Sequence, residues 1–152
     1  MRVAATPAFL ESVANHPRVF AAIAPAGRAA FDLSAHWADC ISFEFDTGGW
    51  VFHRIAAGVY DAHTLFLPKS KDVQAKAAEV LHYLFTRDAR LIIGRIPADL
   101  PHAQRLARVM GLTFSHCLDV TLQRADEAVA YHEYHLTQEA WASQHMELKH
   151  GT

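Results

Sequence analysis

Cysteine is scarce in this sequence. Only Cys40 and Cys117 occur among 152 residues, and they do not stand in the spacing of a zinc-binding motif. A small scaffold held together by several disulfides is therefore excluded. We expect both cysteines to be free thiols.

The sequence also lacks a strong charge of either sign and a long apolar run. The formal net charge is −2, so there is no broad basic field for nucleic acid, although Arg105 and Arg108 could form a local patch. No apolar run approaches the roughly 20 residues of a membrane span. The first residues, 1–7, lack the apolar stretch of a secretory signal. We expect an intracellular protein that binds neither membrane nor nucleic acid.

Histidine, by contrast, is abundant but scattered. The chain has 11 histidines, and the closest pair, His132 and His135, is one residue short of the His-Glu-x-x-His metal-binding pattern. On a strand these two side chains would point to opposite faces. The sequence therefore predicts no metal site.

The composition is that of one globular domain. Hydrophobic residues make up 51% of the chain and charged residues 20%, which is enough apolar surface for one continuous core. Residues 1–36 form a largely helical N-terminal segment in this interpretation. Helices are predicted over 8–15 and 18–23, separated by His16-Pro17 because the residue before proline disfavours helix. Residues 31–40 are read as a loop with a short strand.

The middle of the chain changes from one hydrophobic period to another. Apolar and polar residues alternate over 41–46, 50–55 and 59–67, as in half-buried strands. Turns at Thr47-Gly48-Gly49 and 56–58 would join these strands into an antiparallel meander. Apolar residues then recur at helical spacing over 73–85. Asp72 would cap the start of this helix.

The remaining elements complete a mixed α/β domain. A strand is predicted over 91–96, then a helix capped by Asp99 and ended by Gly111. Strands over 113–123 and 128–136 follow, and a last helix over 137–149. Residues 1–152 are thus one domain with a C-terminal strand-helix extension, 128–152. A helix between strands predicts one parallel crossover, so the sheet should be mixed and mostly antiparallel, flanked by helices.

This order resembles the GNAT acetyltransferase fold. The resemblance rests on Val59 to Pro68, the helix that ends at Leu84-Phe85, the strand Ile92 to Pro97 and the helix that closes with Arg108-Val109-Met110-Gly111-Leu112. The pattern looks most like acetyltransferase-like proteins of phages and prophages. It implies acetyl-CoA as a cofactor and a bacterial cytoplasmic location, or a place in a virion.

In that family the strand before the central helix separates from its neighbour and pairs with the pantetheine arm of acetyl-CoA. The next loop holds the pyrophosphate at the N-terminus of a helix. Here the resemblance implies a cofactor site made of nine residues: Leu65, Phe66, Leu67, Lys69, Ser70, Lys71, Asp72, Val73 and Gln74.

Three family positions differ. The loop usually reads Arg/Gln-x-x-Gly-x-Gly/Ala, but residues 69–76 contain no glycine, and the Asp72 carboxylate would repel phosphate. Leu100 stands where members often carry a cofactor-contacting asparagine. Ala107 stands where many carry the tyrosine that protonates the departing thiolate.

Three residues could still act in acid–base chemistry. Asp61 and His63 share one face of the predicted third strand with Leu65, and His63 titrates near neutrality. Glu44, expected on an adjacent strand, is a second candidate base. The alternative is that His63 is a packed structural residue.

Two functions follow from these observations. The lost loop glycines, asparagine and tyrosine favour a GNAT-fold protein without catalysis, acting as a structural, virion or assembly component. Its partners would be proteins, or copies of itself, bound through residues 131–148, where Tyr131, Tyr134 and Trp141 are expected to be exposed. The alternative is an active N-acetyltransferase with a divergent cofactor loop.

Overall fold

A computed structural model describes residues 1–150, with side chains described through Glu147. The elements follow in the order β1 (Arg2–Val3), α1 (Ala8–Ala14), α2 (Pro17–Ile23), the 3-10 helix η1 (Ser34–Asp39), β2 (Cys40–Phe45), β3 (Gly48–Ala56), β4 (Val59–Phe66), α3 (Val73–Phe85), β5 (Leu91–Pro97), α4 (Pro101–Val109), β6 (Thr113–Gln123), β7 (Ala128–Thr137) and α5 (Gln138–His150).

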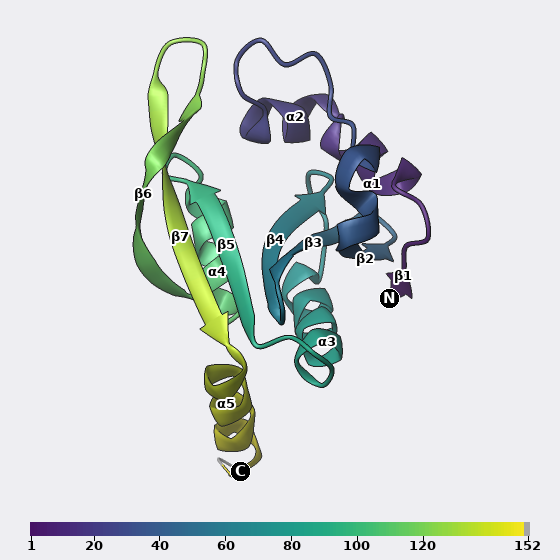
Figure 1. Cartoon of the computed structure of the whole chain (residues 1–152), viewed down its shortest axis with the longest axis vertical. Coiled ribbons are helices and arrows are strands. Elements are labelled where there is room, and N and C mark those ends of the chain that lie inside the picture. The colour runs from purple at the N-terminus through teal and green to yellow at the C-terminus, as the bar shows by residue number, and fades with distance from the viewer. Residues whose placement is uncertain (151–152) are drawn as a thin grey trace.

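Within the described residues the strands form one seven-stranded sheet in the order β1-β2-β3-β4-β5-β7-β6. Only β4 and β5 run parallel, joined by the crossover through α3, and every other neighbouring pair is antiparallel. The prediction of a mixed, mostly antiparallel sheet flanked by helices is confirmed. Figure 1 shows β4 and β5 near the middle of the molecule, with the β6–β7 hairpin on one side and β1–β3 on the other.

Two apolar cores lie on opposite faces of the sheet. The larger one packs α3 and α4 against the sheet around Trp50, Phe52 and Tyr134, all nearly inaccessible to solvent. The smaller one packs α1 onto β3 and β4 through Leu10 and its neighbours. Because the strand residues alternate between these two cores, successive side chains of β4 serve different faces.

The region before β2 differs from its prediction. Residues 34–39 form the 3-10 helix η1, and the short strand β1 pairs with β2. A short 3-10 helix of six residues leaves no apolar periodicity in the sequence, which is why residues 31–40 were read as loop and strand. The predicted turn is also displaced: the chain turns at Asp46-Thr47, and both following glycines lie in β3. A Cβ on Gly49 would clash with the Phe43 carbonyl, so glycine here permits close strand pairing.

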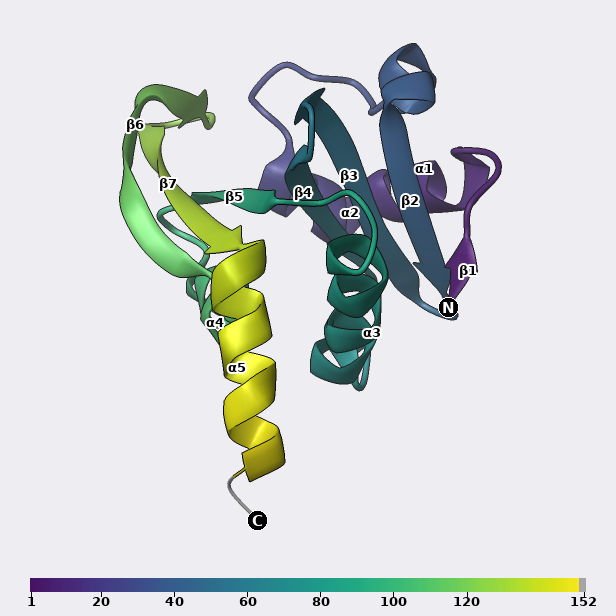
Figure 2. The same ribbon diagram turned by 60° about the horizontal axis from the view of Figure 1, so that its bottom comes forward.

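The aromatic residues of the C-terminal extension are not exposed, contrary to prediction. Tyr134 is 1% exposed in the main core. Trp141 stacks on Phe85 of α3 with ring centroids 5.3 Å apart. Figure 2 shows α5 leaving the end of β7 on the side of α3. Association through residues 131–148 remains a prediction, part of which lies outside the residues whose side chains are described.

Candidate functional site

The central feature of the molecule is a cleft where β4 and β5 separate. The two strands pair only over Val59–Ala62 and Leu91–Gly94. Beyond that point β4 continues beside β3, and β5 continues beside β7 to Pro97. Each strand therefore follows its outer neighbour, and the sheet opens between them. The resulting cleft has a volume of about 1080 Å³.

Residues far apart in the sequence surround this cleft. Residues 61–66 of β4 and 94–97 of β5 form its two long sides, and α4 contributes Leu100 and Leu106. Residues from α1, from the segment after α2 and from η1 close it on the face of the smaller core. The walls are largely apolar with a few polar side chains, as is common for sites that bind small molecules.

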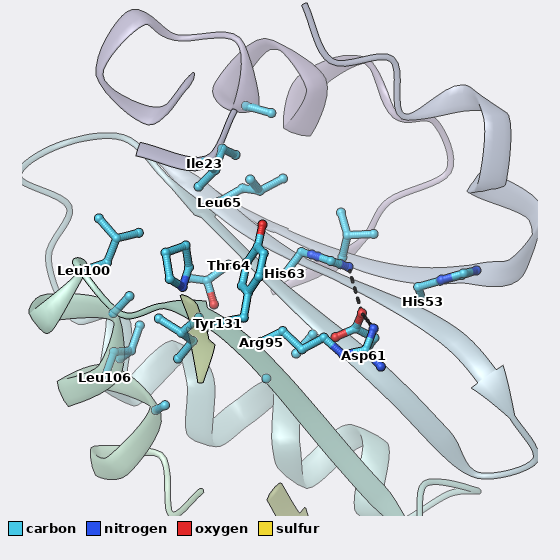
Figure 3. Close-up of a pocket in the computed structure, with 18 of the residues that line it drawn as sticks. Ile23, His53, Asp61, His63, Thr64, Leu65, Arg95, Leu100, Leu106 and Tyr131 are labelled. Carbon is cyan, nitrogen blue, oxygen red and sulfur yellow. Dashed lines mark hydrogen bonds and ion pairs between the residues drawn. The ribbon is translucent and has the colours of Figure 1, made fainter. Parts of the chain in front are cut away.

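A chain of charged groups runs from β4 through β5 to β7. Figure 3 shows its members Asp61, His63 and Arg95. Asp61 Oδ2 lies 3.6 Å from His63 Nε2 and 3.4 Å from an Arg95 guanidinium nitrogen. The Arg95 Nε donates to Glu133 at 3.1 Å, and Glu133 also contacts His135 at 2.9 Å. Asp61 and Glu133 are each about nine-tenths buried, and Arg95 keeps both carboxylates paired.

One oxygen of this network has no partner. Asp61 Oδ1 is inaccessible to solvent and makes no hydrogen bond to any described residue. A buried acceptor without a donor is costly, and such groups often mark a place where a ligand or water binds. Asp61 and His63, which were predicted to share one face of the strand, contact each other.

His63 is held as a neutral imidazole at pH 7. Burial within the cleft lowers its pKa below the ordinary 6.5, and positive charge on His53 and Arg95 lowers the pKa further, while Asp61 opposes both. The side chain nevertheless remains 54% exposed to the solvent that fills the cleft. A neutral, accessible imidazole has a free acceptor nitrogen and can take up a proton.

Tyr131 supplies a phenol to the cleft, a position that the sequence did not predict for it. It projects into the cleft from β7, opposite Pro97 of β5 (Figure 3). Burial raises its pKa, so it stays protonated at neutral pH and can donate a proton. Ala107, at the family's tyrosine position, lines the same cleft. No short-range signal could have identified Tyr131, because the β5–β7 pairing alone brings it here.

The loop before α3 contains no glycine, but two of its residues adopt a backbone conformation that is typical of glycine. Lys69 and Asp72 have φ values of 64° and 57°, in the left-handed region that glycine adopts most easily. Asp72 does occupy the N-cap position of α3, as predicted, but its side chain makes no capping hydrogen bond. The left-handed backbone removes the extended geometry that an N-cap side chain needs. The first backbone N–H groups of α3 are therefore not taken by Asp72.

The other predicted site residues divide into two groups. Leu65 and Phe66 line the cleft, and Leu67 packs beside α1. The loop residues do not line the cleft: Ser70 and Val73 are half-buried, while Lys69, Lys71, Asp72 and Gln74 are exposed.

Glu44 is not part of this site. It lies on β2, which β3 separates from β4, and it pairs with Arg2 of β1 in a separate small pocket. The expectation of an adjacent strand was wrong, because β3 takes the central place in the meander.

Arg124 joins the end of β6 to Asp99 and to the C-terminal turn of α2. From the end of β6 its guanidinium donates to both oxygens of Asp99 at 2.9 and 3.0 Å, and to the carbonyls of Ala21 and Ala22 at 3.0 and 2.8 Å. The carbonyls at the C-terminus of α2 lack helical partners, so Arg124 satisfies them. Asp99, predicted as the cap of α4, binds Arg124 instead, and Leu100 takes the N-cap position.

Replacing Arg124 by alanine is expected to lower the free energy of unfolding by about 1–2 kcal/mol, because several charge-assisted hydrogen bonds disappear. Urea denaturation measures the change, with Arg105→Ala on the exposed face of α4 as the control. Arg124 lowers the pKa of Asp99 below 3.8. The contribution of this pair is therefore present above pH 3.8 and lost as pH falls. Equal stability of the two variants would show that the hydrogen bonds of Arg124 do not stabilise the fold.

Comparisons with known proteins identify the architecture. No family model matches this sequence, and a search of curated proteins found no match. Solved structures do match: a probable GNAT-family acetyltransferase from Chromobacterium violaceum superposes with a TM-score of 0.57 at 16% identity, over 68% of this chain and 59% of that one. The chain has the GNAT fold. It spans less than two thirds of that relative's length.

Two further structures support the GNAT fold. An acetyltransferase of the GNAT family from Bacillus anthracis matches at 17% identity with a TM-score of 0.57, over 66% of this chain and 67% of that one. Spermidine N-acetyltransferase from Vibrio cholerae, in complex with CoA and spermine, matches at 14% identity with a TM-score of 0.62, over 70% of each chain. Identities this low establish the fold alone.

The comparisons confirm the fold predicted from the sequence but not the predicted origin or role. The GNAT fold is confirmed, and the structural neighbours are acetyltransferases. Neither the fold nor these neighbours support a phage origin or a virion role. No helix within residues 1–150 is long and apolar enough to span a membrane.

Proposed function

We propose that this GNAT-fold protein is an acetyl-CoA-dependent N-acetyltransferase. The observation that carries the proposal is the separation of β4 from β5, which opens a cleft of about 1080 Å³ beside His63 and Asp61. The structural neighbours that are acetyltransferases support it. The departures from the family's loop sequence favour a protein without catalysis, but the uncapped N-terminus of α3 and the accessible histidine favour the enzyme.

The residues around the cleft fit the cofactor in most respects. The edge of β4 that faces β5 lacks a described strand partner over residues 63–66, so its backbone groups can pair with an amide-bearing arm. Lys69 and Lys71 place two exposed cations beside the N-terminus of α3, where phosphate binds well. The exposed Asp72 carboxylate is the unfavourable group. Acetyl-CoA would supply an acetyl group activated as a thioester.

The chain's own residues can move the protons that the transfer requires. The Asp61 carboxylate near His63 Nε2 favours a proton on that nitrogen, which leaves Nδ1 as the acceptor. His63 would take a proton from the attacking amine. Tyr131 can donate a proton on the opposite side of the cleft.

The charges around the cleft favour a small primary amine. Two arginines, Arg28 and Arg95, and two aspartates, Asp32 and Asp61, line it, so its fixed charge is balanced. A polycation would be attracted by a clear excess of acidic groups, which this cleft does not have. We therefore infer an acceptor with one amine, in contrast to the polyamine named for the Vibrio cholerae structure.

Calorimetric titration with acetyl-CoA tests the first part of the proposal. We expect saturable binding at one site, in the micromolar range. Release of CoA thiol in a screen of small amines then tests the transfer, with an amine-free reaction to correct for the free thiols of Cys40 and Cys117. Absence of binding at millimolar acetyl-CoA would refute the proposal.

Replacing Asp72 by asparagine is expected to raise the affinity for acetyl-CoA about fivefold. The change removes a negative charge near the phosphates, an effect of about 1 kcal/mol at 4 Å in a water-like environment. Asparagine also tolerates the left-handed backbone, so the loop should keep its shape. Calorimetry at low and high salt measures the change, which should shrink as salt rises.

Asp88→Asn is a matched control, since this carboxylate lies at the other end of α3 and contacts the Tyr60 hydroxyl. An equal effect of both substitutions would place the phosphates elsewhere.

A further inference from the structure

Three metal-ligating side chains from two elements meet at one rim of the cleft. His36 and Asp39 belong to η1, and His53 belongs to β3. In a 3-10 helix, side chains three residues apart lie directly above one another, so His36 and Asp39 face the same side. The chain then enters β2 at Cys40, whose partner across the β2–β3 ladder is His53. The register of the hairpin thus places His53 beside the end of η1.

The geometry of this cluster is close to that of a metal site. One ligand atom from each of His36, Asp39 and His53 lies within 4.8 Å of the other two. The imidazole rings have centroids 5.7 Å apart. Zinc bonds of about 2.0–2.2 Å to nitrogen and oxygen require ligand atoms about 3.3–3.5 Å apart. The ligand atoms therefore need to move closer together by roughly 1 Å. Exposed or half-exposed side chains can rotate that far.

The three side chains have no other described role. Among the described residues, no hydrogen bond or ion pair reaches either imidazole or the Asp39 carboxylate. By contrast, His63, His116 and His135 each lie next to a carboxylate, that of Asp61 or Glu133. Ligand groups left unpaired side by side are available for a cation.

We propose that His36, Asp39 and His53 bind a divalent first-row transition ion, with Zn²⁺ as the ion to test. Two imidazoles and one carboxylate form a donor set that zinc accepts, with its fourth position left to water. The ion neutralises Asp39 and joins η1 to β3. His36 and His53 also line the cleft that contains His63. This proposal does not depend on the acetyltransferase function.

A second group of possible ligands is a weaker candidate. His116 and His135 contact Glu133 at 3.6 and 2.9 Å, but the Arg95 guanidinium also binds Glu133. A cation there would have to lie beside a fixed positive charge. The Cys40 thiol, next to the proposed site, donates to the His36 carbonyl at 3.2 Å, and burial and Asp39 raise its pKa. We therefore do not count it as a ligand.

Zinc titration of the chelator-treated full chain tests the proposal. Calorimetry with ZnCl₂ is expected to show one tight site, which His53→Gln and Asp39→Asn weaken. Changes outside the ligand set of a metal site already cost about 10- to 100-fold in affinity, so loss of the His53 ligand should cost about 100-fold or more. His116→Ala is the control and should leave the affinity unchanged. Excess Mg²⁺ should not compete, because it prefers oxygen ligands.

The outcomes are distinct. One zinc per chain, lost in His53→Gln and kept in His116→Ala, supports the site. Loss in His116→Ala alone assigns the ion to Glu133 and overturns the proposal, as does the absence of any tight site in the wild-type chain. If His53→Gln fails to fold, the Asp39→Asn variant on the exposed face of η1 gives the same test. A chain that binds zinc but not acetyl-CoA would support this site and refute only the proposed enzyme.

Discussion

Replacing His63 by alanine is expected to lower kcat/KM for acetyl transfer by about 10²- to 10⁴-fold, the usual contribution of a positioned general base. The imidazole is accessible in the cleft and lies 3.6 Å from the Asp61 carboxylate that orients it. Acetyl-CoA affinity should change little, because the proposed cofactor contacts of β4 are made by its backbone. Steady-state kinetics with the best amine acceptor, together with calorimetry, separates the two effects.

The pH profile of the wild-type protein gives an independent check on His63. Its pKa is lowered below 6.5, so the neutral, proton-accepting form increases as pH rises through that lowered value. We therefore expect kcat/KM to fall on the acid side with a midpoint below 6.5. That acid limb should be absent from the residual activity of His63→Ala.

His82→Ala is the matched control for His63, because His82 is an exposed histidine of α3 that lies outside the cleft lining. Its substitution should leave kcat/KM within about twofold. Full activity in His63→Ala would show that this histidine is a packed structural residue, the alternative left open by the sequence.

Introducing tryptophan at Thr64 is expected to weaken acetyl-CoA binding by at least about 100-fold. Thr64 lies in the part of β4 that has separated from β5, and its side chain lines the cleft. An indole there fills space that a buried ligand needs. The fold should persist, because Thr64 is exposed and remains paired with Trp50 of β3. Calorimetry measures the affinity, and thermal unfolding confirms the fold.

Thr121→Trp provides the same substitution at an exposed position of β6, away from the cleft. It should bind acetyl-CoA as the wild type does. Unchanged affinity in Thr64→Trp would mean that the cofactor binds outside the space between β4 and β5.

Local patterns in the sequence predicted most of the fold. The apolar residues from Val73 to Phe85 follow the helical period, and α3 begins and ends at these two residues. Alternation predicted β2, β3 and β4 to within a few residues. The 3-10 helix η1 was missed, because a helix of only six residues shows no clear hydrophobic period. Gly48 and Gly49 were read as a turn, although they serve the strand contact with β2 and β4.

The candidate site was predicted only where its residues are close in sequence. Alternation alone placed Asp61 and His63 on one face of β4. Their partners Arg95 and Glu133 lie on β5 and β7, and only the register of those strands brings them to Asp61. Asp72 shows another limit: its residue type is typical of a cap, but its backbone conformation prevents that role.

The short pairing between β4 and β5 also divides the molecule dynamically. One half-sheet, β1–β4, and the other, β5–β7, share backbone pairing only over Val59–Ala62 and Leu91–Gly94. Such units can open separately from global unfolding, which amide hydrogen exchange detects. A molecule lying along the free edge of β4 would act as an additional strand between the halves. Binding would then slow exchange on both sides of the gap, including amides of β5 that touch no ligand.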